Sequence, residues 1–133
     1  MAYKKFILAT NETTNFNQLL TDNKFVTHAI LFDINKSSIK QESLDFIKQL
    51  AIWLKKNTMI KLEIDGHTDN DGSATANIIL SQNRADEVKK QLIVSGIDAT
   101  RLTTKGYGAT KPIKPNTTPE DKAENRRVEF VKK

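Results

Sequence analysis

The period of the apolar residues changes twice between residues 40 and 95, and this change limits the fold more than any other feature. In residues 40–56 apolar side chains recur at helical spacing, at Leu44, Ile47, Leu50, Ala51 and Leu54. Ile60, Leu62 and Ile64 then alternate with charged residues, which is typical of a strand with one covered and one wet face. A second amphipathic helix follows and ends before Gly96, with apolar positions at Ile78, Ala85, Val88 and Leu92. The sequence therefore predicts two helices that each bury one side against a sheet.

Three further strands are expected around this unit. Residues 25–32 are β-branched and aromatic, residues 102–107 are closed by glycines, and residues 126–131 follow a short helical turn near 119–124. The order β-α-β-α-β-β predicts an α/β (α+β) two-layer sandwich, with a mixed sheet and the helices on one face. The Asn- and Thr-rich residues 1–24 are interpreted as an arm or linker, and residues 25–133 as the domain.

Composition excludes several classes of function. A chain of 133 residues fits one domain, and the absence of cysteine excludes disulfides, thiolate metal sites and cysteine nucleophiles. The net charge of +5 is compatible with an acidic partner or with an ordinary solvated surface. Its lysines and arginines occur as scattered pairs among acids, so no basic run of the nucleic-acid-binding type is present.

The hydrophobic pattern also bears on location. No apolar stretch approaches the roughly 18–20 residues needed to cross a membrane. The opening residues 1–9 turn polar too early for a signal peptide. The chain is expected to be cytosolic or, in preference, a domain of a longer exported protein, associated with a membrane only through an anchor outside this sequence.

The densest polar constellation is the loop His67–Gly72 together with the helix that follows it, which Ser73 or Asp71 can cap. Asn77, Ser81 and Arg84 recur on one face of that helix and begin near Asp69. An aspartate and an arginine offered together suit a zwitterion, because the carboxylate pairs with an ammonium and the guanidinium with a carboxylate. Two simpler readings stay open: Asp69 pairs with Arg84, or Asp69 caps the helix.

Other chemistry receives little support. His67 and Asp69 could ligate a metal, but two histidines in the chain leave a poor ligand set, so no metal or other cofactor is expected. No Gly-x-Ser-x-Gly turn is present for a serine nucleophile. Paired glycosidase carboxylates are not excluded by the sequence, although nothing in it places two of them together.

One set of motifs resembles a known family. The residues in question are Gly66-His67-Thr68-Asp69-Asn70-x-Gly72, Asn77-x-x-Leu80-Ser81-x-x-Arg84-Ala85, Gly106-Tyr107-Gly108 and Asn125-Arg126-Arg127-Val128-Glu129-Phe130. With Phe32-Asp33-x-Asn35-Lys36-Ser37 upstream, they resemble the OmpA-like (OmpA/MotB) peptidoglycan-binding domain over about residues 25–131. Lys122 stands where that family usually has an arginine, which removes a guanidinium fork.

The resemblance implies noncovalent, non-enzymatic binding of the diaminopimelate-containing stem peptide of peptidoglycan, on the periplasmic side of a cell envelope and in association with an outer membrane. It implies that Asp69 and Arg84 hold the amino-acid end of the ligand. The other residues that it places in the site are Thr68, Asn77, Ser81, Asn35, Arg126 and Arg127. One of the two arginines is expected to be structural. The alternatives are a docking or weakly dimerising module of a membrane complex, a cell-wall enzyme and, last, a nucleic-acid binder.

Overall fold

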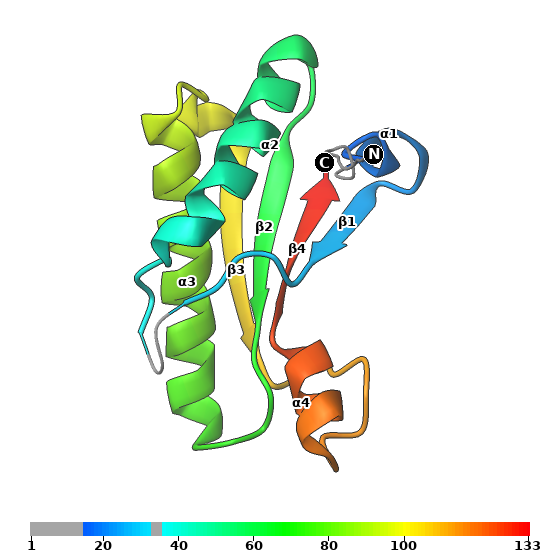
Figure 1. Ribbon diagram of the computed structural model, residues 1–133, viewed down its shortest axis with the longest axis vertical. Coiled ribbons are helices and arrows are strands. Elements are labelled where there is room, and N and C mark those ends of the chain that lie inside the picture. Colours follow the sequence, from blue (N-terminus) through cyan, green and yellow to red (C-terminus); the bar gives the residue numbers. More distant parts are fainter. Residues whose placement is uncertain (1–14, 33–35) are drawn as a thin grey trace, which may run out of the picture.

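The computed structural model describes residues 15–32 and 36–133, in which a four-stranded mixed sheet forms one layer (Figure 1). The strand order is β1-β4-β2-β3. β2 and β3 are parallel, whereas β4 runs antiparallel to both of its neighbours. The strands are β1 (Lys24–Thr27), β2 (Leu62–His67), β3 (Leu102–Gly108) and β4 (Arg127–Lys132).

The two long helices, α2 (Leu44–Lys56) and α3 (Ala74–Val94), cover the same face of this sheet (Figure 1). Their apolar stripes and the alternate residues of the strands meet in one core, where they bury Leu50 and Leu54 of α2, Val88 and Leu92 of α3, and Leu62, Ile64 and Phe130 of the sheet. The two-layer α+β architecture with helices on one face is confirmed. None of the helices in the described ranges is long and apolar enough to span a membrane.

Glycines allow α3 to lie unusually close to the two parallel strands. A Cβ atom on Gly66 would stand 2.4 Å from the carbonyl oxygen of Ser81, and one on Gly106 would stand 2.3 Å from the amide nitrogen of Gln82. Any larger side chain would push the helix away from the sheet. This close contact holds the first half of α3 directly over the ends of β2 and β3.

Short elements complete the layers. Ser73 caps α3 by accepting a hydrogen bond from the amide of Ala76 at 3.0 Å, which selects it over Asp71 as the capping residue. The helical turn predicted near 119–124 is α4 (Pro119–Asn125), which begins with a proline in its first turn and leads straight into β4. Two 3₁₀ turns, Gln41–Ser43 and Ala99–Arg101, precede α2 and β3.

The interpretation of residues 1–24 as an arm is wrong for its last third. The short helix α1 (Gln18–Thr21) belongs to the domain, because Phe16 and Leu19 are buried in the common core. The Phe16 ring lies 5.5 Å from that of Phe46 and 6.3 Å from that of Trp53, between centroids. A few apolar residues in a polar segment give no measurable period, which explains the error. Residues 1–14 lie outside the described ranges.

The first strand is shorter than predicted, and the face of β2 turned away from the helices is more buried than predicted. β1 ends at Thr27, and Phe32 forms only an isolated antiparallel bridge with Ile39. The intervening segment is held to α2 by the amide of Leu31, which donates to Ser43 Oγ at 2.8 Å. On the face of the sheet away from the helices, Asp65 is 5% exposed, because neighbouring strands crowd it on both sides.

Candidate functional site

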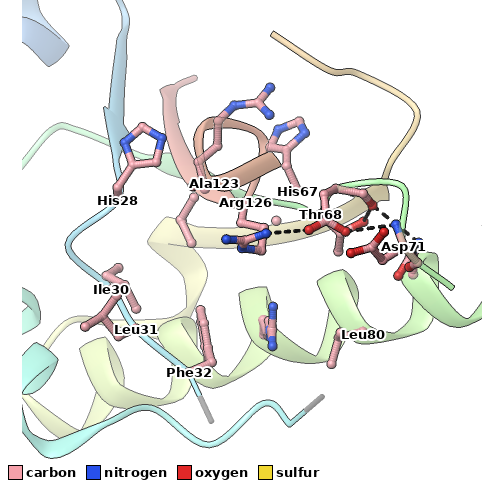
Figure 2. A pocket seen from close by; sticks show the side chains of 16 residues that line it. His28, Ile30, Leu31, Phe32, His67, Thr68, Asp71, Leu80, Ala123 and Arg126 are labelled. Atoms are coloured by element: carbon pink, nitrogen blue, oxygen red, sulfur yellow. Dashed lines mark hydrogen bonds and ion pairs between the residues drawn. The ribbon is translucent and has the colours of Figure 1, made fainter. Parts of the chain in front are cut away.

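A cavity of about 570 Å³ opens where the ends of β2 and β4 meet α3, α4 and the segment before residue 33 (Figure 2). Its apolar wall comes from Ile30, Leu31 and Phe32 of that segment and from Leu80 of α3. Its polar wall contains Thr68, Asp69, Asp71, Asn77, Arg84, Arg126 and Arg127. The polar residues near the end of β2 and those of the Asn125-Arg126-Arg127 motif, far apart in sequence, therefore meet at one place.

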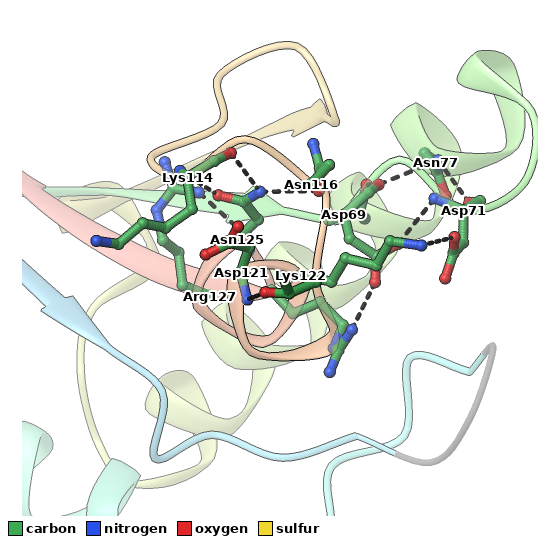
Figure 3. Close-up of polar contacts among 12 residues, drawn as sticks. Asp69, Asp71, Asn77, Lys114, Asn116, Asp121, Lys122, Asn125 and Arg127 are labelled. Atoms are coloured by element: carbon green, nitrogen blue, oxygen red, sulfur yellow. Dashed lines mark hydrogen bonds and ion pairs between the residues drawn. The ribbon is translucent and has the colours of Figure 1, made fainter.

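The loop after β2 is held rigidly by its own hydrogen bonds (Figure 3). Asp69 Oδ1 accepts from the amide of Asp71 at 2.9 Å. Asn77 Nδ2 donates to the carbonyl of Asp71 at 2.9 Å and to that of Asp69 at 3.4 Å. The amide of Thr68 donates to the carbonyl of Gly108 at 2.9 Å, which ties the loop to β3. Thr68 and Asn77 line the cavity, but their described bonds serve to fix the Asp69 carboxylate.

Arg126 is the ionic partner of Asp69. Its Nη1 lies 2.5 Å from Asp69 Oδ2, and this contact is dashed in Figure 2. The aspartate side chain is 9% exposed and the arginine side chain 48% exposed. Neither of the simpler readings from sequence holds, because Asp69 pairs with Arg126 rather than Arg84 and Ser73 caps the helix.

Arg84 reaches the cavity from the adjacent helix α3. Its Nε donates to the carbonyl of Lys36 at 2.9 Å, and its guanidinium lies over the ring of Phe32, 4.8 Å from the centroid. Burial lowers the pKa of Arg84, the positive charge of Arg126 lowers it further, and Asp69 opposes the change. Arg84 and Arg126 thus place two guanidiniums near the Asp69 carboxylate, and this part of the wall can pair with both the carboxylate and the ammonium of a zwitterionic ligand.

The two adjacent arginines have different environments. The Arg127 side chain is 2% exposed, and its Nε donates to Glu129 Oε2 at 2.7 Å. Its remaining nitrogens donate to the backbone carbonyls of Asn125 at 3.1 Å and Lys111 at 2.9 Å. Arg127 is therefore the structural arginine of the pair, and Arg126 is the one available to a ligand.

Lys122 and Asp71 form an ion pair that the sequence did not predict. Lys122 Nζ lies 2.8 Å from Asp71 Oδ1, so α4 is joined to the loop after β2 (Figure 3). The hydrogen bond and charge of Asp71 raise the pKa of Lys122. Asp71 belongs to the quoted loop motif, but its partner is 51 residues away and no sequence spacing indicates the pair.

Asn125 fixes the loop between β3 and α4. Its Oδ1 accepts from the amides of Ile113 and Lys114 at 2.8 and 2.9 Å, and its Nδ2 donates to the carbonyl of Lys114 and to Asn116 Oδ1. It is fully buried. The asparagine of the Asn-Arg-Arg motif is thus a scaffold residue, which the motif match alone did not distinguish from a binding residue.

Two predicted site residues are not part of the described cavity wall. Ser81 is 1% exposed, and its Oγ donates to the carbonyl of Ile78 at 3.0 Å and accepts from the amide of Gly108 at 2.8 Å. Its hydroxyl therefore joins α3 to β3 and does not face the cavity, in contrast to the prediction. Helical spacing placed it on the correct side of α3 but not at the correct depth. Asn35 lies outside the described residues.

A second polar cluster, formed by Asp65, His67 and Glu129, lies on the sheet face away from the helices. Burial raises the pKa of Asp65 to about 7, with help from the Glu63 and Glu129 carboxylates. Burial and the charge of Arg127 lower the pKa of His67 to about 4. The His67 ring stacks on Tyr107, with 5.2 Å between centroids. His67 and Asp69, considered together as metal ligands from sequence, belong to different clusters.

The sequence profile of the OmpA family matches residues 31–126, which include Asp69, Arg84 and Arg126 of the cavity wall. The chain belongs to the OmpA family. This OmpA-family chain is 39% identical over 102 residues to "Probable lipoprotein YiaD" of Escherichia coli, covering 77% of this chain and 47% of that protein. It is 37% identical over 102 residues to "Peptidoglycan-binding protein ArfA" of Mycobacterium bovis, covering 77% and 31%. The chain thus spans less than half of these relatives.

Solved structures of OmpA-like domains share the fold. The periplasmic domain of Helicobacter pylori MotB is similar with a TM-score of 0.72 at 27% identity, over 82% of this chain and 73% of that one. The peptidoglycan-associated lipoprotein from Burkholderia pseudomallei gives 0.72 at 25% identity, over 86% and 92%. These comparisons confirm the family and the fold that the sequence motifs indicated.

Proposed function

We propose that this OmpA-family domain binds peptidoglycan noncovalently in the cavity between α3, α4 and the ends of β2 and β4. The observation that carries the proposal is the meeting of Asp69, Arg84 and Arg126 at one partly apolar cavity. The printed names of two similar proteins, a peptidoglycan-binding protein and a peptidoglycan-associated lipoprotein, support the same ligand class. The domain would act as a tether of an envelope protein on the periplasmic side, without cutting any bond.

The ligand group that fits this wall best is the zwitterionic end of diaminopimelate in the stem peptide. Its ammonium would contact the Asp69 carboxylate, which the loop after β2 holds in place. Its carboxylate would contact the guanidinium of Arg84, and the methylene chain would lie along the Phe32 and Leu80 side chains. Removal of either protein charge leaves a partly buried ligand charge unpaired, at a cost on the order of 2–5 kcal/mol.

Arg126 gives the free site a partner for Asp69 before any ligand arrives. Since its side chain is 48% exposed, it can share Asp69 with an ammonium or turn to a second ligand carboxylate at low cost. This arrangement keeps the buried carboxylate neutralised in the free protein. It also favours a stem peptide with free carboxylates over an amidated one, because the wall carries two guanidiniums.

Calorimetric titration tests the proposal. We expect a diaminopimelate-containing muropeptide to bind saturably and its lysine-containing counterpart, which lacks the second carboxylate, to bind at least about tenfold more weakly. Asp69→Asn should weaken both ligands, because each offers an ammonium to this carboxylate, whereas Asp45→Asn, a matched change at an exposed position of α2, should leave both titrations unchanged.

The proposal would be contradicted if neither muropeptide gave a heat of binding. In that case the alternative from sequence, a docking or dimerising module, would be favoured, and light scattering at several concentrations would reveal self-association. Release of soluble fragments from purified sacculi would contradict the non-enzymatic part of the proposal.

A further inference from the structure

The cluster on the uncovered face of the sheet has the composition of a metal site. Asp65 on β2 is the direct register partner of Glu129 on β4, and His67 follows two residues later on the same side of β2. One ligand atom from each of the three residues lies within 4.8 Å of the other two. All three residues are buried, at 5%, 5% and 6% exposure.

Hydrogen bonding within the described chain leaves this cluster short of partners. Asp65 Oδ1 and both ring nitrogens of His67 are buried and make no hydrogen bond to any described residue. His67 Nε2 lies 3.8 Å from Glu129 Oε1, beyond hydrogen-bonding distance. Buried polar atoms are almost always satisfied by a hydrogen bond, so three unsatisfied atoms in one place require an explanation.

We propose that Asp65, His67 and Glu129 bind a divalent transition-metal cation of the zinc type. One imidazole and two carboxylates form a ligand set that zinc accepts, with water in the remaining position. The imidazole makes the set a poor one for magnesium and calcium, which prefer oxygen ligands. A cation at the centre satisfies Asp65 Oδ1 and one ring nitrogen of His67 together, and small side-chain rotations suffice to close the ligands around it.

The neighbouring cationic side chains compete with a metal for Glu129 and so determine the metal affinity of the site. Arg127 Nε donates to Glu129 Oε2, so Glu129 Oε1 is the oxygen that lies near His67. Lys24 Nζ lies 3.2 Å from that Oε1, but its side chain is 51% exposed on the edge strand β1 and can swing into solvent. Lys24 is therefore the competitor that a metal must displace. A hollow of about 270 Å³ beside the cluster, lined by Tyr107 and Lys111, offers the approach.

Calorimetric titration of the metal-stripped full chain with ZnCl₂ tests the site. We expect one saturable zinc per chain and an increase in the melting temperature, with no response to MgCl₂. His67→Gln should weaken zinc binding at least about tenfold, because ligand removal commonly exceeds the 10- to 100-fold effect of outer-shell changes. The chain has two histidines, so His28→Gln, at the exposed one, is the matched control and should bind as the unaltered chain does.

A variant that is expected to bind zinc more tightly complements the loss-of-binding variant, because misfolding would not increase affinity. Lys24→Met removes the competitor and should tighten zinc binding about 2- to 5-fold, the fold-change equivalent of one exposed ion pair. Lys90→Met, at an exposed position of α3 in the other layer, should leave zinc affinity unchanged. The proposal is overturned by an absence of saturable zinc binding, by zinc binding that His28→Gln removes and His67→Gln does not, or by Lys24→Met having no effect.

Discussion

One stretch of five residues, from Asp65 to Asp69, supplies two polar regions with opposite character. Asp69 faces the cavity, where its partner Arg126 is half exposed and exchangeable. Asp65 and His67 face the other side of the sheet, where they are buried and short of hydrogen-bond partners. The period of two along β2 places Asp65 and His67 on the same face of the sheet, whereas Asp69 lies in the loop beyond the end of the strand, where that period no longer applies.

This difference predicts which substitutions should change ligand affinity and which should change the stability of the fold. Charges in the cavity are neutralised by groups that can move, so changes there should alter ligand affinity more than folding. In the buried cluster Glu129 is held by Arg127, whose side chain is 2% exposed and fixed by backbone carbonyls, so changes there should alter folding first. The adjacent residues Arg126 and Arg127 provide the sharpest contrast, because one belongs to each region.

The largest effect is expected from Arg127→Ala. This substitution leaves the Glu129 carboxylate without its buried partner and the carbonyls of Asn125 and Lys111 without a donor. Breaking a buried ion pair in this way costs about 3–5 kcal/mol of unfolding free energy. Urea denaturation with a matched m-value analysis measures it.

Arg126→Ala is the matched control for that measurement. The Arg126 side chain is half exposed, and the Asp69 carboxylate keeps the amide of Asp71 as a donor, so we expect a smaller loss of about 1 kcal/mol in the unfolding free energy. Equal losses in the two variants would break the contrast between the cavity and the buried cluster.

A smaller effect, at most about 1.4 kcal/mol per pH unit for each proton, is expected in the pH dependence of stability. Between about pH 4 and 7 the folded chain keeps a proton on Asp65 that the unfolded chain loses, so this group lowers stability as pH rises. Between about pH 4 and 6.5 the unfolded chain holds a proton on His67 that the folded chain lacks, so this group raises stability as pH rises. The two slopes oppose each other.

Single substitutions should therefore reveal opposite slopes. In the presence of a chelator, Asp65→Asn should make stability rise more steeply between pH 4 and 6.5, and His67→Gln should make it fall, each relative to the unaltered chain. Thermal unfolding across this range provides the readout. Slopes of the same sign in both variants would be inconsistent with the buried cluster as described.

The smallest effect is expected from Lys122→Ala. Its ion pair with Asp71 is exposed, so we expect only a small loss of stability, which should vanish at high salt. Because the pair joins α4 to the loop after β2, muropeptide affinity should fall modestly as well. An affinity loss as large as that of Asp69→Asn would show that Lys122 contacts the ligand itself.

Much of the fold followed from the sequence because its helices are long and strongly periodic. The period change between residues 40 and 95 predicted α2, β2 and α3, and helical spacing placed Asn77 and Arg84 on the side of α3 that meets the cavity. Phe16 and Leu19 were missed because a four-residue helix shows no period. Their burial is decided by contacts with α2, which local patterns do not encode.

The partners of the site charges could not be predicted for a related reason. Asp69 meets Arg126 across 57 residues, and Asp65 meets Glu129 across the β2–β4 ladder. Both pairs depend on the register in which β4 enters between β1 and β2. The sequence contained each residue, but only the assembled sheet determines which charges meet and which stay unpaired.

The most direct test of the cavity assignment is a cycle of four titrations that combines the unaltered chain and Arg84→Gln with diaminopimelate- and lysine-containing muropeptides. If Arg84 contacts the second carboxylate, its removal should weaken the diaminopimelate ligand by on the order of 2 kcal/mol more than the lysine ligand. A coupling free energy of zero, with both ligands weakened equally or neither affected, would contradict the account.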